Sequence, residues 1–215
     1  VVDQLTGNRN IFYQSKQENF SCPLPEEAFA RCKTLILDPE ISFEDLQKVK
    51  KWKQPETLVI YDAERDRPAL NAMKEFADFF IASETILDID SNISRETALQ
   101  GLLADVRGEL IITLGEYGSV WWKDKNKPVH IPSIPLNDTS DTTGAGDVFH
   151  ASFAYFYPQV KDMILSLKYA TYCASLSTTI LGTRKELNYK DGLVSAVQKI
   201  QETYLKDLPE WLILK

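Results

Sequence analysis

Four short apolar runs, separated by segments with helical spacing, constrain the fold of this chain more than any other feature. The apolar runs lie at 34–37, 57–61, 78–82 and 109–113. Helices are expected between them at 42–52, 67–76 and 94–106. The runs are continuous rather than alternating, which is typical of strands buried on both faces. Strands that alternate with helices in this way predict an α/β protein built on a parallel sheet, with helices on both sides.

The segments on either side of this alternation have other patterns. Residues 119–122 and 129–131 predict a hairpin around a charged loop. Beyond it, helices are expected at 148–157, at 159–180, and in a last helix that carries Val194, Val197, Ile200 and Tyr204. At the front, residues 1–14 predict two short strands joined at Thr6-Gly7-Asn8, and 15–25 predict a linker.

The charge balance and the cysteines exclude several classes of protein. The 24 Lys and Arg residues against 31 Asp and Glu give a formal charge of -7, which disfavours binding to nucleic acid or to an anionic membrane surface. No apolar run approaches the roughly 20 residues of a membrane span. Cys22, Cys32 and Cys173 form no CxxC motif and are expected as free thiols in a reducing cytoplasm. His130 and His150 lack the partners of a zinc site.

The stretch from Asp141 to Asp147, D-T-T-G-A-G-D, carries the clearest chemistry and directly precedes the helix expected at 148–157. Gly144 and Gly146 allow backbone N–H groups to converge without an intervening Cβ. N–H groups at a helix N-terminus attract anions, so the loop predicts a phosphate cradle. Asp147 would repel an anion there. The carboxylate suits a general base that takes the proton from a hydroxyl group attacking a phosphoryl group.

The stretch differs from the two common phosphate-binding loops, because neither Gly-Lys-Ser/Thr nor G-x-G-x-x-G occurs. Together with its continuation at 148–153, it resembles the second signature of the ribokinase-like (PfkB) carbohydrate kinases. Three further stretches are similar to that family: T-L-G-E-Y-G at 113–118, the segments 61–67 and 77–84, and the turn Thr6-Gly7-Asn8-Arg9. The resemblance covers essentially the whole chain.

The resemblance implies a three-layer α/β sandwich with a mostly parallel central sheet and a small β lid. Residues 1–14 would belong to the lid and 15–215 to the main kinase domain. The family's first strand, with its sugar-binding Asp, and its Gly-Gly segment are expected ahead of residue 1, because no Gly-Gly pair occurs in the sequence. The activity implied is transfer of the γ-phosphoryl group of ATP to a sugar hydroxyl, with Mg²⁺ shielding the phosphates.

By position, the resemblance also implies roles for individual residues. Asp147 would be the base, and Gly144, Ala145 and Gly146 would form the anion hole. Five residues would bind the nucleotide: Arg9 from the lid, Thr113, Gly115, Gly118 and Thr143. A turn near Gly182 would border the adenine pocket.

The sequence departs from the family at the end of the third strand. The family often has Asn-x-x-Glu there, which places a carboxylate near the metal and the phosphates. Here Ser83 replaces the Asn and Ile86 replaces the Glu, while Glu84 is expected as a surface residue. Fructose-kinase-like members of the ketohexokinase type depart at the same place, so the departure does not exclude activity.

Three functions remain open on the sequence: a sugar kinase, a nucleoside kinase on the same fold, and a non-catalytic nucleotide-binding relative. The intact Asp147 and glycines favour the sugar kinase, with a small sugar and ATP as partners in the cytoplasm. A homodimer that pairs through the lid strands is also expected, since pairing would cover their exposed edges.

Overall fold

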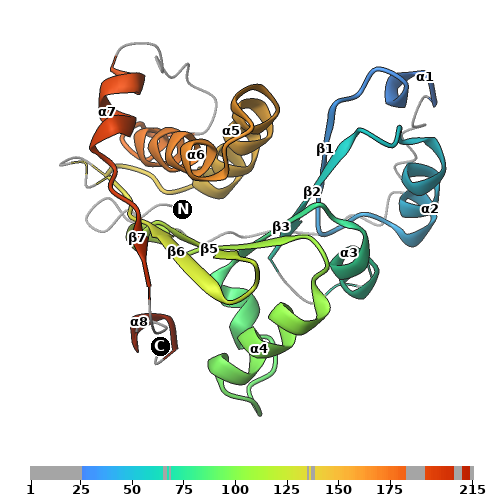
Figure 1. Cartoon of the computed structure of the whole chain (residues 1–215), viewed down its shortest axis with the longest axis horizontal. Helices are drawn as coiled ribbons and strands as arrows, with labels where there is room; N and C mark the ends of the chain where they lie inside the picture. The colour runs from blue at the N-terminus through green and yellow to red at the C-terminus, as the bar shows by residue number, and fades with distance from the viewer. Residues whose placement is uncertain are drawn as a thin grey trace.

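A seven-stranded sheet forms the middle layer of the chain (Figure 1). The computed structural model describes residues 26–64, 67, 69–134, 136, 139–182, 192–205 and 210–213. The strands are β1 (Thr34–Leu37), β2 (Leu58–Ala63), β3 (Phe79–Ser83), β4 (Glu109–Thr113), β5 (Ser119–Lys123), β6 (Lys127–Ile131) and β7 (Thr203–Tyr204). They lie side by side in the order in which they occur along the chain.

Most strands point in the same direction. β1, β2, β3 and β4 pair in parallel, whereas the pairs β4–β5, β5–β6 and β6–β7 are antiparallel. Only β5 and β7 of the described strands therefore run against the others. This confirms the mostly parallel sheet and the hairpin predicted from the sequence.

Helices cover both faces of the sheet, so the predicted three-layer α/β architecture is confirmed. One face packs against α1 (Glu26–Phe29), α2 (Phe43–Trp52), α3 (Leu70–Phe76), α4 (Arg95–Asp105) and α8 (Glu210–Ile213). The other face packs against α5 (Ala145–Val160), α6 (Met163–Ser177) and α7 (Leu193–Lys199). Short 3-10 turns at Glu84–Asp88 and Gly115–Tyr117 follow β3 and β4.

The apolar strand runs supply both cores. Successive residues of a strand face opposite sides. In β2, Ile60 belongs to the core under α5 and α6, and the next residue, Tyr61, belongs to the core under α2 and α3. In β3, Phe79 and Phe80 divide in the same way. A strand of this kind must be apolar at every position, which is why the runs do not alternate.

Two of the predicted helices, at 42–52 and 94–106, begin at a serine that caps them. The Ser42 hydroxyl accepts a hydrogen bond from the Asp45 amide at 3.0 Å and caps α2. The Ser94 hydroxyl accepts one from the Thr97 amide at 3.2 Å and caps α4. Each cap satisfies an amide that has no partner within the helix.

The helix predicted over 159–180 is wrong at its start. Gln159 belongs to α5, which ends at Val160, and α6 begins only at Met163. Lys161 turns the chain with a φ of 51°, and the carboxylate of Asp162 accepts the Leu165 amide to cap α6. The apolar pattern runs on across this turn because both helices pack on the same face of the sheet.

Other boundaries also differ from the prediction. Tyr204 lies in β7 rather than in the last helix, which ends at Lys199. The helix predicted at 67–76 begins at Leu70, and the one predicted at 148 begins three residues earlier, at Ala145. The short elements α1, β7 and α8 were not predicted, because they contain too few residues to show a periodic pattern.

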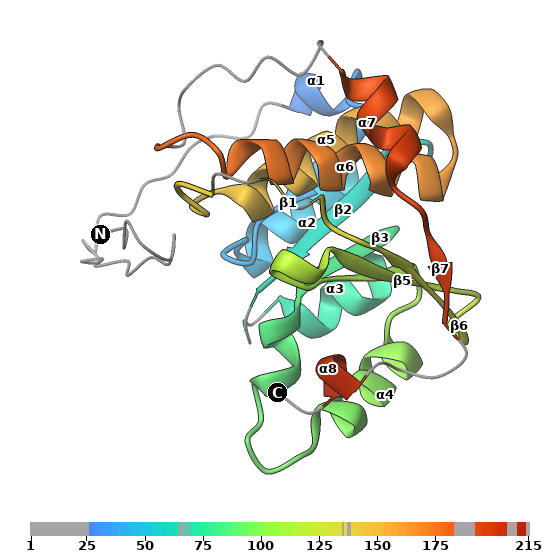
Figure 2. The ribbon, with the colours of Figure 1, turned by 90° about the vertical axis from the view of Figure 1, so that its left-hand side faces the viewer.

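A buried arginine joins the last helix to the rest of the fold. The Arg95 guanidinium donates to the Asp88 carboxylate at 2.6 Å and to the backbone oxygen of Leu212 at 3.3 Å. Figure 2 shows α8 beside α4, beneath the sheet. The contact explains how a four-residue helix is held in place.

The proposed lid at 1–14, with Arg9, lies outside the described residues, as does Cys22. Cys32 and Cys173 are free thiols. Within the described ranges, no helix is long and apolar enough to cross a membrane.

Candidate active site

A cavity of about 890 Å³ opens at the carboxyl ends of β2, β3 and β4, between the sheet and helices α5 and α6. Open α/β sheets commonly bind ligands at this edge. The lining residues are Asp62, Glu64, Ser83, Glu84, Thr113, Leu114, Gly115, Glu116, Gly118, Ser133, Ile134, Leu136, Thr139, Thr142, Ala145, Gly146, Phe149, His150, Thr171, Ala174, Ser175 and Thr178.

The glycine loop forms the start of α5 at the floor of the cavity. Gly144 is the N-cap residue, and its φ of 78° is a left-handed value that favours glycine. Ala145 and Gly146 follow in the first turn and line the cavity. A Cβ added to Gly146 would meet no atom within 4 Å, so the space beside this residue is open. The arrangement places a helix N-terminus against the cavity.

Asp141 fixes this loop to the end of α6. Its side chain is 5% exposed and accepts the Thr143 amide at 2.9 Å and the Gly182 amide at 3.0 Å. The Ser140 and Asp141 amides donate to the Thr178 carbonyl at 2.7 and 3.0 Å. The first residue of the signature is therefore structural. It also brings the predicted turn at Gly182 next to the glycine loop.

Replacing Asp141 with Ala is expected to lower the free energy of unfolding by about 2–3 kcal/mol, because two partly buried hydrogen bonds to a buried carboxylate are lost. Urea denaturation followed by circular dichroism measures the change. Asp90→Ala is the matched control, because Asp90 accepts the Asn92 amide at 2.9 Å in an exposed turn. Equal losses in the two variants would show that the Asp141 clamp does not stabilise the fold.

The nucleotide-side residues predicted from the T-L-G-x-x-G turn lie together on the cavity wall. Thr113 ends β4, and Gly115 and Gly118 follow with φ values of 56° and 93°. A Cβ on Gly118 would lie 2.1 Å from the Ile131 carbonyl oxygen, so this glycine is required by its contact with β6. Gly118 therefore lines the cavity at the point where the turn after β4 packs closely against β6.

The remaining predicted residues lie near the cavity without lining it. Asp147 is exposed in the first turn of α5, and Thr143 is bonded through its amide to Asp141. Gly144 lies behind the first turn, where its carbonyl accepts the Val148 amide at 2.9 Å. The loop thus contributes Ala145 and Gly146 to the wall, and the next residue, Asp147, is exposed outside the lining.

A buried contact between a histidine and a carboxylate beneath the loop was missed by sequence reasoning. The His150 Nε2 atom lies 3.5 Å from the Asp62 carboxylate, and both side chains are largely buried. Burial is the main cause that raises the pKa of Asp62, and the charges of Glu64 and Asp147 raise it as well, whereas His150 acts in the opposite direction. His150 lies four residues after Gly146, one helical turn, and this spacing was the only sequence signal for the contact.

The end of β3 differs from the expectation in one respect. Ile86 is 5% exposed and belongs to the core. An apolar side chain at the position of the family's Glu can be buried in this way. Glu84, expected at the surface, instead lines the cavity, and its side chain is only 18% exposed. The Arg95 guanidinium holds it at 3.3 Å. Ser83 also lines the cavity.

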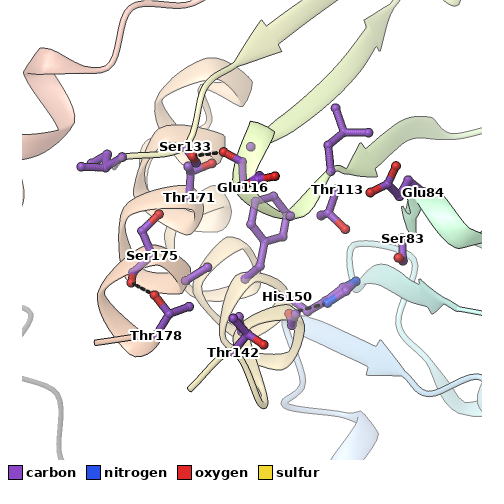
Figure 3. A pocket seen from close by; sticks show the side chains of 18 of the residues that line it. Ser83, Glu84, Thr113, Glu116, Ser133, Thr142, His150, Thr171, Ser175 and Thr178 are labelled. Carbon is purple, nitrogen blue, oxygen red and sulfur yellow. Dashed lines mark hydrogen bonds between the residues drawn. The ribbon is translucent and has the colours of Figure 1, made fainter. Parts of the chain in front are cut away.

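Hydroxyl groups form the side of the cavity opposite Ser83 and Glu84. Figure 3 shows Thr171, Ser175 and Thr178 along α6, with Thr142 and His150 at the floor. The Thr171 hydroxyl is buried and has no hydrogen-bond partner within the described residues. A polar ligand in the cavity would satisfy it. The α6 hydroxyls were missed because the helix pattern shows only its apolar face.

A parallel α/β sheet with a helix N-terminus facing a cavity at its carboxyl edge defines a class of phosphate-binding α/β proteins. Within this class, the chain belongs to the pfkB family of carbohydrate kinases, whose sequence pattern it matches over residues 4–188.

Two proteins with similar sequences are named for pentose substrates. A deoxyribokinase from Salmonella typhi is 29% identical over 168 residues, which cover 74% of this chain and 54% of the relative. A ribokinase from Bacillus subtilis is 30% identical over 159 residues, which cover 74% and 53%. The chain thus spans about half the length of these relatives.

Solved structures share the fold. Arabidopsis thaliana ribokinase, complexed with ribose and ATP, is 25% identical with a TM-score of 0.62, over 74% of this chain and 53% of that one. An E. coli protein described as a ribokinase II, in complex with ATP and Mg²⁺, is 23% identical with a TM-score of 0.62, over 74% and 56%.

Proposed function

We propose that the chain is part of an ATP-dependent sugar kinase. The observation that carries the proposal is the first turn of α5, which presents Gly146 to a polar cavity and continues with an exposed carboxylate, Asp147. An anion cradle and a proton acceptor in one turn suit transfer of a phosphoryl group to a hydroxyl. Membership of the pfkB family supports the same reaction.

In the proposed reaction, Asp147 takes the proton of the sugar hydroxyl while that oxygen forms a bond to the γ-phosphorus. The bond from the γ-phosphorus to the bridging oxygen of ATP breaks, and ADP leaves. The backbone of the Gly144, Ala145 and Gly146 loop stabilises the transferring group. Thr113, Gly115, Gly118 and Thr143 are proposed on the nucleotide side, and Arg9 is proposed as a lid cation near the phosphates.

The cavity suits a nucleotide that carries Mg²⁺. In the described part of the chain, no group of three or more His, Cys, Asp and Glu side chains could hold a metal ion. Mg²⁺ in kinase sites is commonly held by phosphates, water and one or two carboxylates, so a protein cage is not needed. Glu84 is the cavity carboxylate that we propose for this contact. The ion would offset the phosphate charge beside an acidic wall.

The test is a transfer assay with the full-length protein, ATP and Mg²⁺, and a panel of ribose, deoxyribose, fructose and adenosine. The names of the relatives favour a pentose, so we expect the highest kcat/KM with ribose or deoxyribose. Preference for adenosine would support a nucleoside kinase on this fold. ATP binding without transfer to any acceptor would identify a non-catalytic relative and overturn the proposal.

Two further features of the proposed enzyme are its assembly and its location. Pairing between lid strands at 1–14 would give a homodimer, because two exposed edges would be covered at once. Light scattering of the full-length protein should then give twice the protomer mass. The free thiols of Cys32 and Cys173 suit the reducing cytoplasm.

A further inference from the structure

The ring of His150 is surrounded by hydrogen-bond acceptors. Its Nδ1 atom lies 2.7 Å from the carbonyl oxygen of Gly146, and its Nε2 atom lies 3.4 Å from the carbonyl oxygen of Ile81 and 3.5 Å from the Asp62 carboxylate. The residue is 5% exposed, so water cannot readily replace these partners. Every polar contact of the ring therefore involves an oxygen atom of the protein.

These partners favour one protonation state. A carbonyl oxygen can only accept, so each ring nitrogen that faces one must donate. A neutral imidazole has a single N–H and would turn a lone pair towards the second carbonyl. An imidazolium has two N–H groups and satisfies both carbonyls. Its charge is then balanced by Asp62, and a buried charge requires such a partner.

The position of the ring links the pair to the glycine loop. Gly146 is the cavity-lining glycine of the signature, and Asp147 is the next residue. The ring holds the Gly146 carbonyl from below, and Nε2 ties it to β2 and β3. A shift of this turn would move both the anion cradle and Asp147. Positional errors of about 1 Å at a reacting centre can cost roughly 100-fold in rate.

The pair also sets the charge at the floor of the cavity. The charged side chains that line the cavity, among described residues, are those of Asp62, Glu64, Glu84, Glu116 and His150. The charged groups that act on Asp62 besides His150 are all carboxylates: Glu64 after β2, Asp147 on α5 and Asp38 after β1. Without an opposite charge, Asp62 would add a further negative charge next to the position of the phosphates.

We propose that His150 is a positioning residue: as an imidazolium paired with Asp62, it anchors Gly146 and Asp147 for phosphoryl transfer and cancels the charge of Asp62 at the cavity floor. Both N–H groups are occupied by the protein, so the ring acts through the loop rather than by touching the substrate. The catalytic part of this inference rests on the proposed kinase function. The charge state of the ring does not.

The first experiment is nitrogen-15 NMR of the imidazole rings in the full-length protein at neutral pH. The signals that disappear in His150→Gln are those of His150, and His130→Gln identifies the signals of His130 in the same way. We expect two protonated ring nitrogens for His150. A neutral ring with one protonated nitrogen would overturn the ion pair, whatever activity the protein has.

The second experiment is a double-mutant cycle on kcat with His150→Gln, Asp62→Asn and the double variant. His150→Gln keeps a donor but leaves the buried Asp62 charge unpaired, so kcat should fall about 10- to 100-fold with little change in the KM for ATP. Adding Asp62→Asn should restore about tenfold of this loss, because the unpaired charge is removed.

A purely structural role predicts a different pattern, in which the losses appear in the free energy of unfolding and kcat of the folded variants stays at the wild-type value. Losses confined to stability would overturn the positioning role even if NMR shows an imidazolium. If the wild-type protein transfers no phosphoryl group to any acceptor, the proposed function fails, and the NMR result still decides the charge state. If the His150→Gln variant fails to fold, the nitrogen-15 spectrum of the wild-type protein decides whether His150 is an imidazolium.

Discussion

Replacing Asp147 with Asn is expected to lower kcat for phosphoryl transfer by about 10²- to 10⁴-fold, the usual contribution of a general base. An amide has nearly the same shape as a carboxylate but does not accept the proton of the sugar hydroxyl. Asp147 is exposed, so the fold should be preserved. Steady-state kinetics measures kcat, and titration calorimetry should show that ATP still binds, because a negative charge near the phosphates has been removed.

Glu96→Gln is the matched control for this variant. Glu96 is an exposed acidic residue in the first turn of α4, so its replacement also removes a favourable interaction with a helix dipole. Its turnover should stay at the wild-type value. If Asp147→Asn also retains wild-type turnover, Asp147 is not the base and another acceptor must take the proton.

Replacing Gly146 with Val should lower kcat/KM by about 10²-fold or more, because the side chain would block the approach of the phosphoryl group to the loop amides, which has the effect of losing a donor of an anion hole. The added side chain would meet no protein atom near its Cβ, so the chain can accommodate it. The space that it fills belongs to the cavity, next to the helix N-terminus. Transfer kinetics and ATP titration together should show weaker binding or slower transfer with an intact fold.

Gly101→Val controls for the presence of valine in a helix. Gly101 lies in α4 and, like Gly146, would place its Cβ in open space. Neither variant should lose unfolding free energy, because valine has a slightly higher helix propensity than glycine, by a few tenths of a kcal/mol. Only Gly146→Val should lose activity. Wild-type kinetics in that variant would show that the loop is only structural.

The strands could be predicted because burial on both faces produces a continuous run of apolar residues in the sequence. β4, predicted at 109–113, is observed at Glu109–Thr113, since its three central positions are buried between helices on both sides and are all apolar. The break between α5 and α6 could not be predicted. It depends on the left-handed turn at Lys161, a residue type that gives no such signal, while the same core receives apolar side chains from both helices.

The candidate site also has one part that could be predicted from the sequence and one part that could not. The glycine loop was predicted because backbone access to an anion requires small residues in a row, and the cavity lies beside Gly146. The Asp62–His150 pair was not predicted, because the two residues lie 3.5 Å apart only after β2 and α5 have packed together. Glu84 was placed at the surface because its enclosure depends on Arg95, eleven positions away.

The sequential order of the strands has a consequence for the course of folding. From β1 to β6, each strand pairs with the one made just before it, so the sheet can grow as the chain emerges from the ribosome. β7 pairs with β6 only after α5, α6 and α7 have been made. Closing that long loop costs more entropy than any earlier step. The glycine loop is held by Thr178 and Gly182, so we expect it to become ordered after β1 to β6 and once α6 has been made, but before β7 completes the sheet.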